Sequence, residues 1–416
     1  MTHQKKRRVV ITGIGPITCC GIGLEAFRAG LRSPRSPIGA LTAFDPGPLR
    51  ARCAGQIDTW DPKAFFPSSR LKRLDRYAQF AVASAILALD DAGFAWSKEK
   101  PQARTGVSFG TALGGISNAE AEHILFLQKG PRGVNQTLAL QVFGGSAHSN
   151  IAIEFGFRGP GTTNSNSCAS GLVSVGEAMR YIRDGMADVM VAGGAEAPLS
   201  PLSFGAFDLI KTMTRFEGDP ATAYRPFDLT REGFVMGEGG CSLIVEALEH
   251  AEKRGARIYA EVLGYALNNE AWHMTTPLPG GESVVACMEA ALSDSGVPRD
   301  RIDYINAHAS GTQLNDSNET ACVKTVFGAH ARNLMMSGTK PFTAHPLGAT
   351  GAMETAICAL ALHEQWVPPT LNLHTPDPAC DLDNVPNEGR AARVNYALNN
   401  AFGFGGINAS LVLGRI

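Results

Sequence analysis

The sequence has no long run of apolar residues. No stretch reaches the roughly 18 consecutive apolar residues that a helix needs to cross a bilayer. The best run, from Ala81 to Leu89, is half that length and predicts a buried helix. The N-terminus passes from basic residues directly into Val9, Val10 and Ile11, without the apolar core or cleavage site of a signal peptide. We therefore expect a soluble, cytoplasmic protein.

The chain also has little net charge and no paired cysteine motif. A formal charge of -2 over 416 residues gives no support for nucleic-acid binding, and the basic cluster 5–8 is interpreted as a solvated terminus. Nine cysteines without a C-x-x-C pair fit a reducing compartment, with at most one or two thiols used chemically. No zinc or calcium ligand spacing occurs, so no metal site is predicted.

The chain is long and rich in glycine, and segments with strand patterns alternate along it with segments with helix patterns. At 416 residues with 46 glycines, the chain predicts two cores or one duplicated unit, with many tight turns. Short β-branched runs at 8–12, 188–192 and 242–245 predict buried strands, and apolar residues at helical spacing predict helices over 172–182 and 356–361. Strands that alternate with helices favour an α/β fold whose sheets are covered on both faces.

A faint internal repeat accompanies this pattern. Segments 237–245 and 403–412 each place a glycine turn before an apolar strand, and each would close one half of the chain. The strand at 9–12 opens the first half, and 258–264 is expected to open the second. We infer a duplicated α/β unit, with an N-terminal half at 1–255 and a C-terminal half at 256–416.

Three segments could carry chemistry. The first places Cys168 after a polar, glycine-bounded approach and directly before an amphipathic helix. The positive end of a helix dipole favours a thiolate, which an acyl-accepting nucleophile needs. The alternative is a small buried thiol at a strand–helix junction.

The second segment places His308 at the end of an apolar strand, 302–305, before a small and polar loop. Loops at strand ends are where active-site groups gather, although a lone histidine is more often structural. The third segment puts Lys340 and His345 in one glycine-rich loop and Glu354 on the apolar helix that follows. A carboxylate on an apolar face needs a partner, and Lys340 or a histidine is the natural one; the alternative is a glutamate at the helix rim.

One glycine pattern is rejected as a cofactor site. Gly13 and Gly15 superficially match a dinucleotide-binding loop, but the third glycine is missing and Pro16 occupies the turn. No nicotinamide cofactor is therefore expected.

Taken in order, the three segments resemble the Cys–His–His signature of the β-ketoacyl-acyl-carrier-protein synthases, and most closely the type II elongating enzymes and their polyketide relatives. The similarity runs essentially end to end, and further matching motifs lie at 8–15, 193–196, 225–228, 233–239, 273–277 and 403–408. The resemblance implies a thiolase-type, duplicated, five-layered αβαβα fold. It also implies a decarboxylative condensation between an acyl thioester and malonyl-carrier protein, within fatty acid or specialised polyketide or polyene synthesis.

The resemblance also assigns roles to residues. Cys168 would carry the acyl group, with its own N–H and that of Phe404 as the oxyanion hole and the Phe404 side chain as a gate. His308 and His345 would stabilise the enolate as neutral imidazoles. Lys340 would support this pair, and its charge would be balanced by two carboxylates. The remaining assignments are Asp316 and Glu354 as those carboxylates, and Thr275, Thr276 and Thr312 as the residues that hold the phosphopantetheine arm.

The partners implied are an acidic acyl carrier protein and a second ketosynthase-like subunit, identical or a companion. Substrates arrive on the carrier's phosphopantetheine, so no cofactor of the protein's own is expected. Basic residues should receive the carrier; those in the corresponding segments are Arg70, Lys72 and Arg73, with Lys211 a weaker candidate and an ordinary charged helix as the alternative.

Some positions depart from the family pattern. Asn164 and Ser167 stand where relatives carry an apolar residue and an alanine, which predicts a more polar wall beside Cys168 and favours a specialised acyl substrate slightly over a plain saturated one. The other departures are Ala309 and Ser310 for a Gly–Thr pair, Ile407 for a threonine and Asp208 for a carrier-docking arginine.

Three related classes are weaker alternatives. A non-catalytic chain-length partner would lack the nucleophile, whereas Cys168 is present. A biosynthetic thiolase would carry a second cysteine in the final glycine loop, and 404–408 contains none. An initiating synthase would use a Cys–His–Asn set instead of two histidines in separate motifs.

Overall fold

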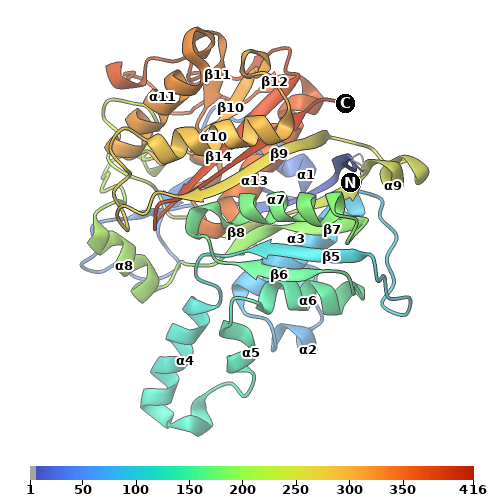
Figure 1. Cartoon of the computed structure of the whole chain (residues 1–416). Helices are drawn as coiled ribbons and strands as arrows, with labels where there is room; N and C mark the ends of the chain where they lie inside the picture. The colour runs from blue at the N-terminus through green and yellow to red at the C-terminus, as the bar shows by residue number, and fades with distance from the viewer. Residues whose placement is uncertain (1–5) are drawn as a thin grey trace.

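The computed structural model describes residues 6–416, and its main element is one mixed sheet (Figure 1). Its strand order is β11-β10-β14-β15-β9-β1-β8-β7-β5-β6, with the short β2 (Gly21–Ile22) beside β1. The strands are β1 (Val9–Thr18), β5 (Thr105–Gly110), β6 (Gly161–Asn164), β7 (Val189–Glu196), β8 (Gly239–Ala247), β9 (Ala260–Asn269), β10 (Tyr304–Asn306), β11 (Met335–Ser337), β14 (Tyr396–Gly403) and β15 (Ile407–Gly414).

The same strand arrangement occurs twice. In β6-β5-β7-β8-β1 and in β11-β10-β14-β15-β9, the first three strands are parallel and the last two run antiparallel to their neighbours. The predicted duplication is therefore confirmed, and the two similar segments lie in β8 and β15. Because β1 pairs with β9 through Val10–Glu261 and Ile11–Ala260, the two halves form one continuous sheet. The division near residue 255 stays a prediction.

Helices complete five layers. Helices α3 (Arg76–Asp91) and α6 (Ser146–Phe155) cover the outer face of the first half, and α10 (Glu282–Ser295) and α11 (Gln313–Phe327) cover that of the second. Helices α7 (Ser170–Arg183) and α13 (Thr350–Glu364) lie between the strands of the two halves (Figure 1). Helix α13 is buried from Thr350 to Leu362, as expected of a helix that is apolar all round.

The glycines of β1 serve packing. A Cβ at Gly13 would lie 2.2 Å from the Ala88 carbonyl oxygen, and one at Gly15 would lie 2.0 Å from that of Ser84. Both positions therefore let α3 approach the strand closely, which explains the glycine pattern without a dinucleotide. Strand β1 continues through these glycines to Thr18, six residues beyond the predicted end, because the packed helix leaves no room there for the side chains on which the prediction depended.

The basic cluster near the N-terminus is not simply solvated. Arg7 pairs with Asp188 at 2.8 Å and has a side chain only 24% exposed, and Arg8 pairs with Glu261 at 2.6 Å. Lys5 lies outside the described residues. The prediction of a solvated terminus was wrong for Arg7, because its guanidinium finds carboxylates at the start of β7 and on neighbouring elements.

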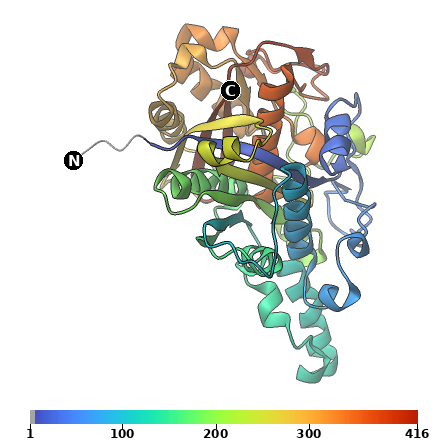
Figure 2. The same ribbon diagram turned by 90° about the vertical axis from the view of Figure 1, so that its right-hand side faces the viewer.

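Helices α4 (Ile116–Lys129) and α5 (Leu138–Val142) extend away from the body as an arm (Figures 1 and 2). None of the helices within residues 6–416 combines the length and apolar character required for a membrane crossing.

The remaining elements are α1 (Leu24–Leu31), α2 (Ser68–Leu71), α8 (Pro201–Ile210), α9 (Leu248–Lys253), α12 (Lys340–Thr343), β3 (Gly39–Ala40), β4 (Cys53–Ala54), β12 (Trp366–Val367) and β13 (Arg390–Ala391).

Candidate active site

Cys168 lies in a 3₁₀ turn, Ser167–Ala169, between β6 and the start of α7. Ser167 has a φ of 52°, so the turn is sharp, and unusual backbone of this kind persists only where the surroundings hold it. A Cβ at Gly171 would lie 2.7 Å from the Ala352 backbone nitrogen. Small residues after the cysteine therefore let α7 and α13 meet closely behind the sulfur.

The thiol is buried, with Cys168 only 6% exposed. Burial raises the pKa of the Cys168 thiol, although the Ser167 hydroxyl, the charge of Lys340 and the Phe404 N–H act to lower it. Burial therefore opposes the resting thiolate that the sequence analysis expected from the helix terminus. A base is needed to remove the proton.

His345 is placed to be that base. Its Nε2 lies 3.2 Å from the Cys168 sulfur, and its Nδ1 lies 2.9 Å from the Thr350 hydroxyl at the start of α13. On either side of the histidine, Ala344 and Leu347 have φ values of 54° and 39°. This backbone turns the imidazole toward the nucleophile.

His308 follows β10 and stands beside His345, with ring centroids 5.7 Å apart and planes at 78°. Burial and the charge of Lys340 hold the pKa of both imidazoles well below its usual range, so both rings are neutral. No hydrogen bond fixes the ring of His308 through its buried Nδ1, which has no partner among residues 6–416. Its backbone is fixed instead: the Glu319 carboxylate accepts from the N–H of His308 and of Ala309, each at 2.9 Å.

Lys340 and Glu354 form a fully buried ion pair, with Nζ 2.6 Å from Oε1. Lys340 also donates to the backbone carbonyl of His308. Burial raises the pKa of Glu354 to about 7, with Lys340 opposing that rise. The predicted partnership of these two residues is confirmed.

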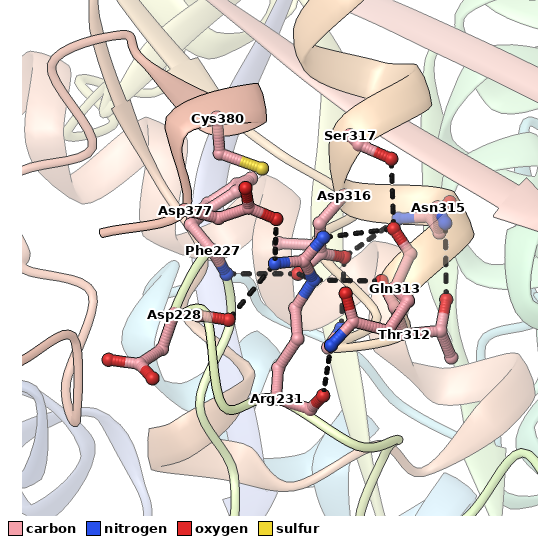
Figure 3. A network of polar contacts seen from close by, with 12 residues as sticks. Phe227, Asp228, Arg231, Thr312, Gln313, Asn315, Asp316, Ser317, Asp377 and Cys380 are labelled. Atoms are coloured by element: carbon pink, nitrogen blue, oxygen red, sulfur yellow. Dashed lines mark hydrogen bonds and ion pairs between the residues drawn. The ribbon is translucent and has the colours of Figure 1, made fainter. Parts of the chain in front are cut away.

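Asp316 is not the second partner of Lys340, which corrects the expectation. Figure 3 shows it in a separate network, where its carboxylate accepts from the N–H of Phe227 and lies 3.6 Å from Nε of Arg231. Arg231 also donates to the carbonyl of Thr312, so this network secures the loop after His308.

Glu319 is a residue that the sequence analysis missed. It is fully buried on α11, and the neighbouring Lys340 opposes the burial that raises its pKa to about 7. A carboxylate one turn beyond Asp316 on a helix of mixed polarity gave no signal of its own in the sequence.

A cavity of about 320 Å³ leads to these groups. Cys168, His308 and His345 line it, and so do all three predicted arm-binding threonines, Thr275, Thr276 and Thr312, together with Lys211 and Phe404. The Phe404 ring stacks on Phe207, with centroids 6.2 Å apart and planes at 16°. Candidate residues from six separate segments of the chain thus converge on one cavity.

Other predicted residues lie outside this cavity. Arg70 hydrogen-bonds Asn150 at 2.9 Å, whereas Lys72 and Arg73 are exposed near the end of α2. Asp208 is buried and accepts from the backbone of Arg50, so it is not free to meet a carrier.

The predicted polar wall is present only in part: the Ser167 hydroxyl lies 3.8 Å from the Cys168 sulfur, whereas Asn164 does not line the cavity. The Asn164 amide donates to the Ser170 carbonyl and the Ser174 hydroxyl, at the start of α7. The amide group of Asn164 is hydrogen-bonded to α7, so Asn164 no longer favours a specialised substrate over a plain saturated one.

Comparison with known proteins agrees with this geometry. Residues 6–251 match the family described as beta-ketoacyl synthase, N-terminal domain, and residues 259–374 match the corresponding C-terminal domain. The chain belongs to the β-ketoacyl synthase family. It is 40% identical over 411 residues to 3-oxoacyl-(acyl-carrier-protein) synthase 2 of Synechocystis sp., covering 99% of both chains.

The family relatives include polyketide enzymes as well. The chain is 42% identical over 414 residues to putative polyketide beta-ketoacyl synthase 1 of Streptomyces cyaneus, covering 98% of both chains. Among solved structures, the ishigamide ketosynthase/chain length factor superposes with a TM-score of 0.92 at 35% identity, over 99% of this chain and 100% of the other. The thiolase-type αβαβα fold predicted from the sequence is confirmed.

Proposed function

We propose that this ketosynthase condenses an acyl thioester held on Cys168 with malonyl-carrier protein, with loss of CO2. The observation that carries the proposal is the 3.2 Å contact between the Cys168 sulfur and Nε2 of His345, in a cavity that His308 also lines. A thiol beside a neutral base is suited to nucleophilic catalysis.

In the first half-reaction, Cys168 attacks the carbonyl of the incoming acyl thioester. His345 takes the thiol proton on Nε2 and returns it to the departing carrier thiolate, so the carrier leaves as a free thiol. The N–H groups of Cys168 and Phe404 stabilise the oxyanion. The contact of Phe404 N–H with the sulfur supports this assignment.

In the second half-reaction, the C–C bond to the malonyl carboxylate breaks and its electrons form an enolate on the thioester. The N–H groups of His308 and His345 stabilise the enolate oxygen, which requires neutral rings, and burial keeps the pKa of both low. The enolate carbon attacks the acyl-Cys168 carbonyl, the C–S bond breaks, and the released Cys168 thiolate takes up a proton from solvent, the one proton that the overall condensation consumes. Because the Thr350 hydroxyl can donate or accept, it supports both tautomers of His345.

The proposal includes the carrier protein and a second subunit. Thr275, Thr276 and Thr312 would hold the phosphopantetheine arm, which brings the substrate, and the reaction needs no cofactor of the enzyme's own. The arm of α4 and α5 exposes apolar side chains, with Leu127 at 71% and Leu140 at 66%, which supports burial against a homodimeric or companion subunit. The cytoplasm is the proposed location.

Two kinds of pathway fit this activity, primary fatty acid synthesis and specialised polyketide or polyene synthesis. The relatives at 40% and 42% identity represent both kinds, so they do not decide between them. Mass spectrometry of products formed from malonyl-carrier protein and a panel of acyl primers separates the two.

The nucleophile is tested by replacing Cys168 with alanine. Cys168→Ala should abolish condensation and the acyl adduct seen by intact mass, while slow malonyl decarboxylation remains because both histidines are intact. Cys20→Ala is the matched control and should retain the adduct, since burial raises the pKa of that thiol to about 12. Full condensation activity in Cys168→Ala would contradict the proposal. Failure of the parent protein to become acylated would instead favour the class of non-catalytic chain-length partners.

The role of His345 is tested by measuring CO2 release separately from acyl transfer. His345→Ala should lower malonyl decarboxylation by about 100-fold or more, the usual contribution of a positioned acid–base group. Acylation of Cys168 by a reactive acyl thioester should still occur, more slowly. An unchanged CO2 release rate would contradict the assignment.

A further inference from the structure

A further buried carboxylate, that of Glu196, lies near the nucleophile and outside the catalytic set described above. Glu196 is the last residue of β7 and is fully buried. It accepts four hydrogen bonds, all from uncharged donors: one hydroxyl and three backbone N–H groups. A buried carboxylate with four fixed donors is a strong local restraint.

The four donors come from two separate segments. Thr111 Oγ1 at 2.9 Å, Ala112 N at 2.6 Å and Leu113 N at 3.0 Å belong to the loop after β5, in the first half. Gly348 N, at 3.0 Å, belongs to the second half and lies three residues after His345. One side chain therefore ties a loop of the first half to the catalytic loop of the second.

Both segments contact residues in or directly beside the turn that carries Cys168. The Ser170 hydroxyl lies 3.3 Å from the Thr111 carbonyl oxygen, and the Ser165 hydroxyl donates to the Ala112 carbonyl at 3.0 Å. On the other side, Nε2 of His345 lies 3.2 Å from the sulfur. The nucleophile thus sits between the two segments that Glu196 joins.

The packing around Glu196 leaves no slack. A Cβ at Gly348 would lie 2.5 Å from the Ala112 nitrogen and 2.7 Å from Oε2 of Glu196. A Cβ at Gly194 would lie 2.5 Å from the Gly348 carbonyl oxygen. The positive φ of Leu347, 39°, also needs surroundings that hold it. A displacement of the carboxylate is therefore passed directly to the loop of His345.

We infer that Glu196 is a positioning residue, which sets the distance between His345 and Cys168 through Gly348 while it anchors the 111–113 loop against the same turn. The inference rests on the proposed condensing activity. The carboxylate also has an electrostatic effect: its negative charge raises the pKa of the Cys168 thiol, and its own pKa is raised by burial to about 7. Glu196 is therefore coupled to the nucleophile by charge as well as by geometry.

The test is Glu196→Gln, which keeps the shape but removes the charge and one acceptor. We expect kcat for condensation to fall by about 10- to 100-fold, the cost of misplacing reacting groups by an ångström. KM for malonyl-carrier protein should stay within about twofold, because the threonine-lined arm site is untouched. The alkylation rate of Cys168 by iodoacetamide, followed against pH, should show a lower apparent thiol pKa than in the parent, since the neighbouring negative charge is gone. A purely structural role would not produce that shift.

A second variant keeps the inference testable if Glu196→Gln does not fold. Thr111→Val removes one hydroxyl donor and should lower kcat by about fivefold, the worth of one hydrogen bond of about 1 kcal/mol. Thr105→Val is the matched control, since Thr105 is also buried and lies at the opposite end of β5, where its hydroxyl bonds Gln102 at 2.8 Å.

Two results would overturn the inference. The first is a folded Glu196→Gln whose alkylation profile and kcat match those of the parent; the second is an equal kcat for Thr111→Val and Thr105→Val. Failure of the proposed function would look different, because then the parent itself would form no condensation product, while the alkylation profiles would still report on Glu196.

Discussion

At the scale of single residues, the buried pair of Lys340 and Glu354 shows how much of the site a sequence can reveal. The glutamate stands on a helix of Ala, Ile and Leu, where an unpaired carboxylate would be costly, so a cation nearby was predictable. The partner of Asp316 was not predictable in the same way. Asp316 and Glu319 lie about one turn apart on α11, and only the packing decides that Glu319 approaches Lys340 while Asp316 approaches Arg231.

Breaking this pair should be costly and dependent on pH. Lys340→Met leaves the Glu354 carboxylate buried without its cation, and removing one partner of a buried pair costs about 3–5 kcal/mol of unfolding free energy. The pKa of Glu354 is already raised to about 7, and the loss of Lys340 raises it further. Because the protonated Glu354 carboxyl group costs little free energy to bury, the loss of unfolding free energy should be large at pH 8 and small at pH 5.

Urea unfolding at the two pH values measures this effect. The double variant Lys340→Met/Glu354→Leu is the control, and it should recover much of the stability lost at pH 8 because no charge remains buried. Equal losses at pH 5 and pH 8, or a double variant no more stable than the single one, would show that charge burial is not the cause.

At the scale of elements, the sequence predicted which segments form strands and helices better than where they end. The apolar runs that predicted β1, β7 and β8 are only the parts of each strand rich in β-branched residues. The strands continue through glycine, as β1 does through Gly13 and Gly15, because a helix packed against the backbone there tolerates no side chain. That requirement comes from tertiary packing, which a local pattern does not contain.

Helix α3 offers a test of a buried helix cap. Asp75 caps its N-terminus by accepting from the Ala78 N–H at 3.2 Å, and burial raises the pKa of this carboxyl from 3.8 to about 7. Between these values the folded state holds a proton that the unfolded state has lost, so Asp75 makes stability fall as pH rises toward 7. An asparagine at this position would cap equally well without titrating.

The expected result for Asp75→Asn is a change in relative stability with pH. Between pH 5 and pH 8, the unfolding free energy of the variant should rise relative to that of the parent by up to about 3 kcal/mol. This value corresponds to about two pH units at about 1.4 kcal/mol each. Urea titrations of both proteins at several pH values provide the measurement. Parallel stability profiles would mean that Asp75 does not titrate in this range.

At the scale of the whole molecule, the predicted carrier surface separates into two parts. Lys211 lines the cavity, whereas Lys72 and Arg73 are exposed outside it. Lys72→Glu with Arg73→Glu should therefore raise KM for carrier-bound acyl substrate by about tenfold, through lost electrostatic attraction. KM for a small acyl thioester without a carrier should not change.

A matched pair distinguishes docking from net charge. Lys98→Glu with Lys100→Glu changes the total charge by the same amount at other exposed positions, and should leave both KM values near those of the parent. Steady-state kinetics with both substrate types, at low and moderate salt, provides the comparison. Equal effects of the two double variants would remove Lys72 and Arg73 from the docking surface.

The strand order carries a consequence for how such a site arises. The two halves can be compared by rotating one onto the other. The Cys168 turn, which precedes α7, then corresponds to the 347–349 turn, which precedes α13. In the same way, the 111–113 loop corresponds to the segment that holds His308. Corresponding loops therefore face each other across the rotation axis. A lone copy of the repeating unit would present only one side of that pairing, and would have to associate with its own twin before a sulfur and an imidazole could meet.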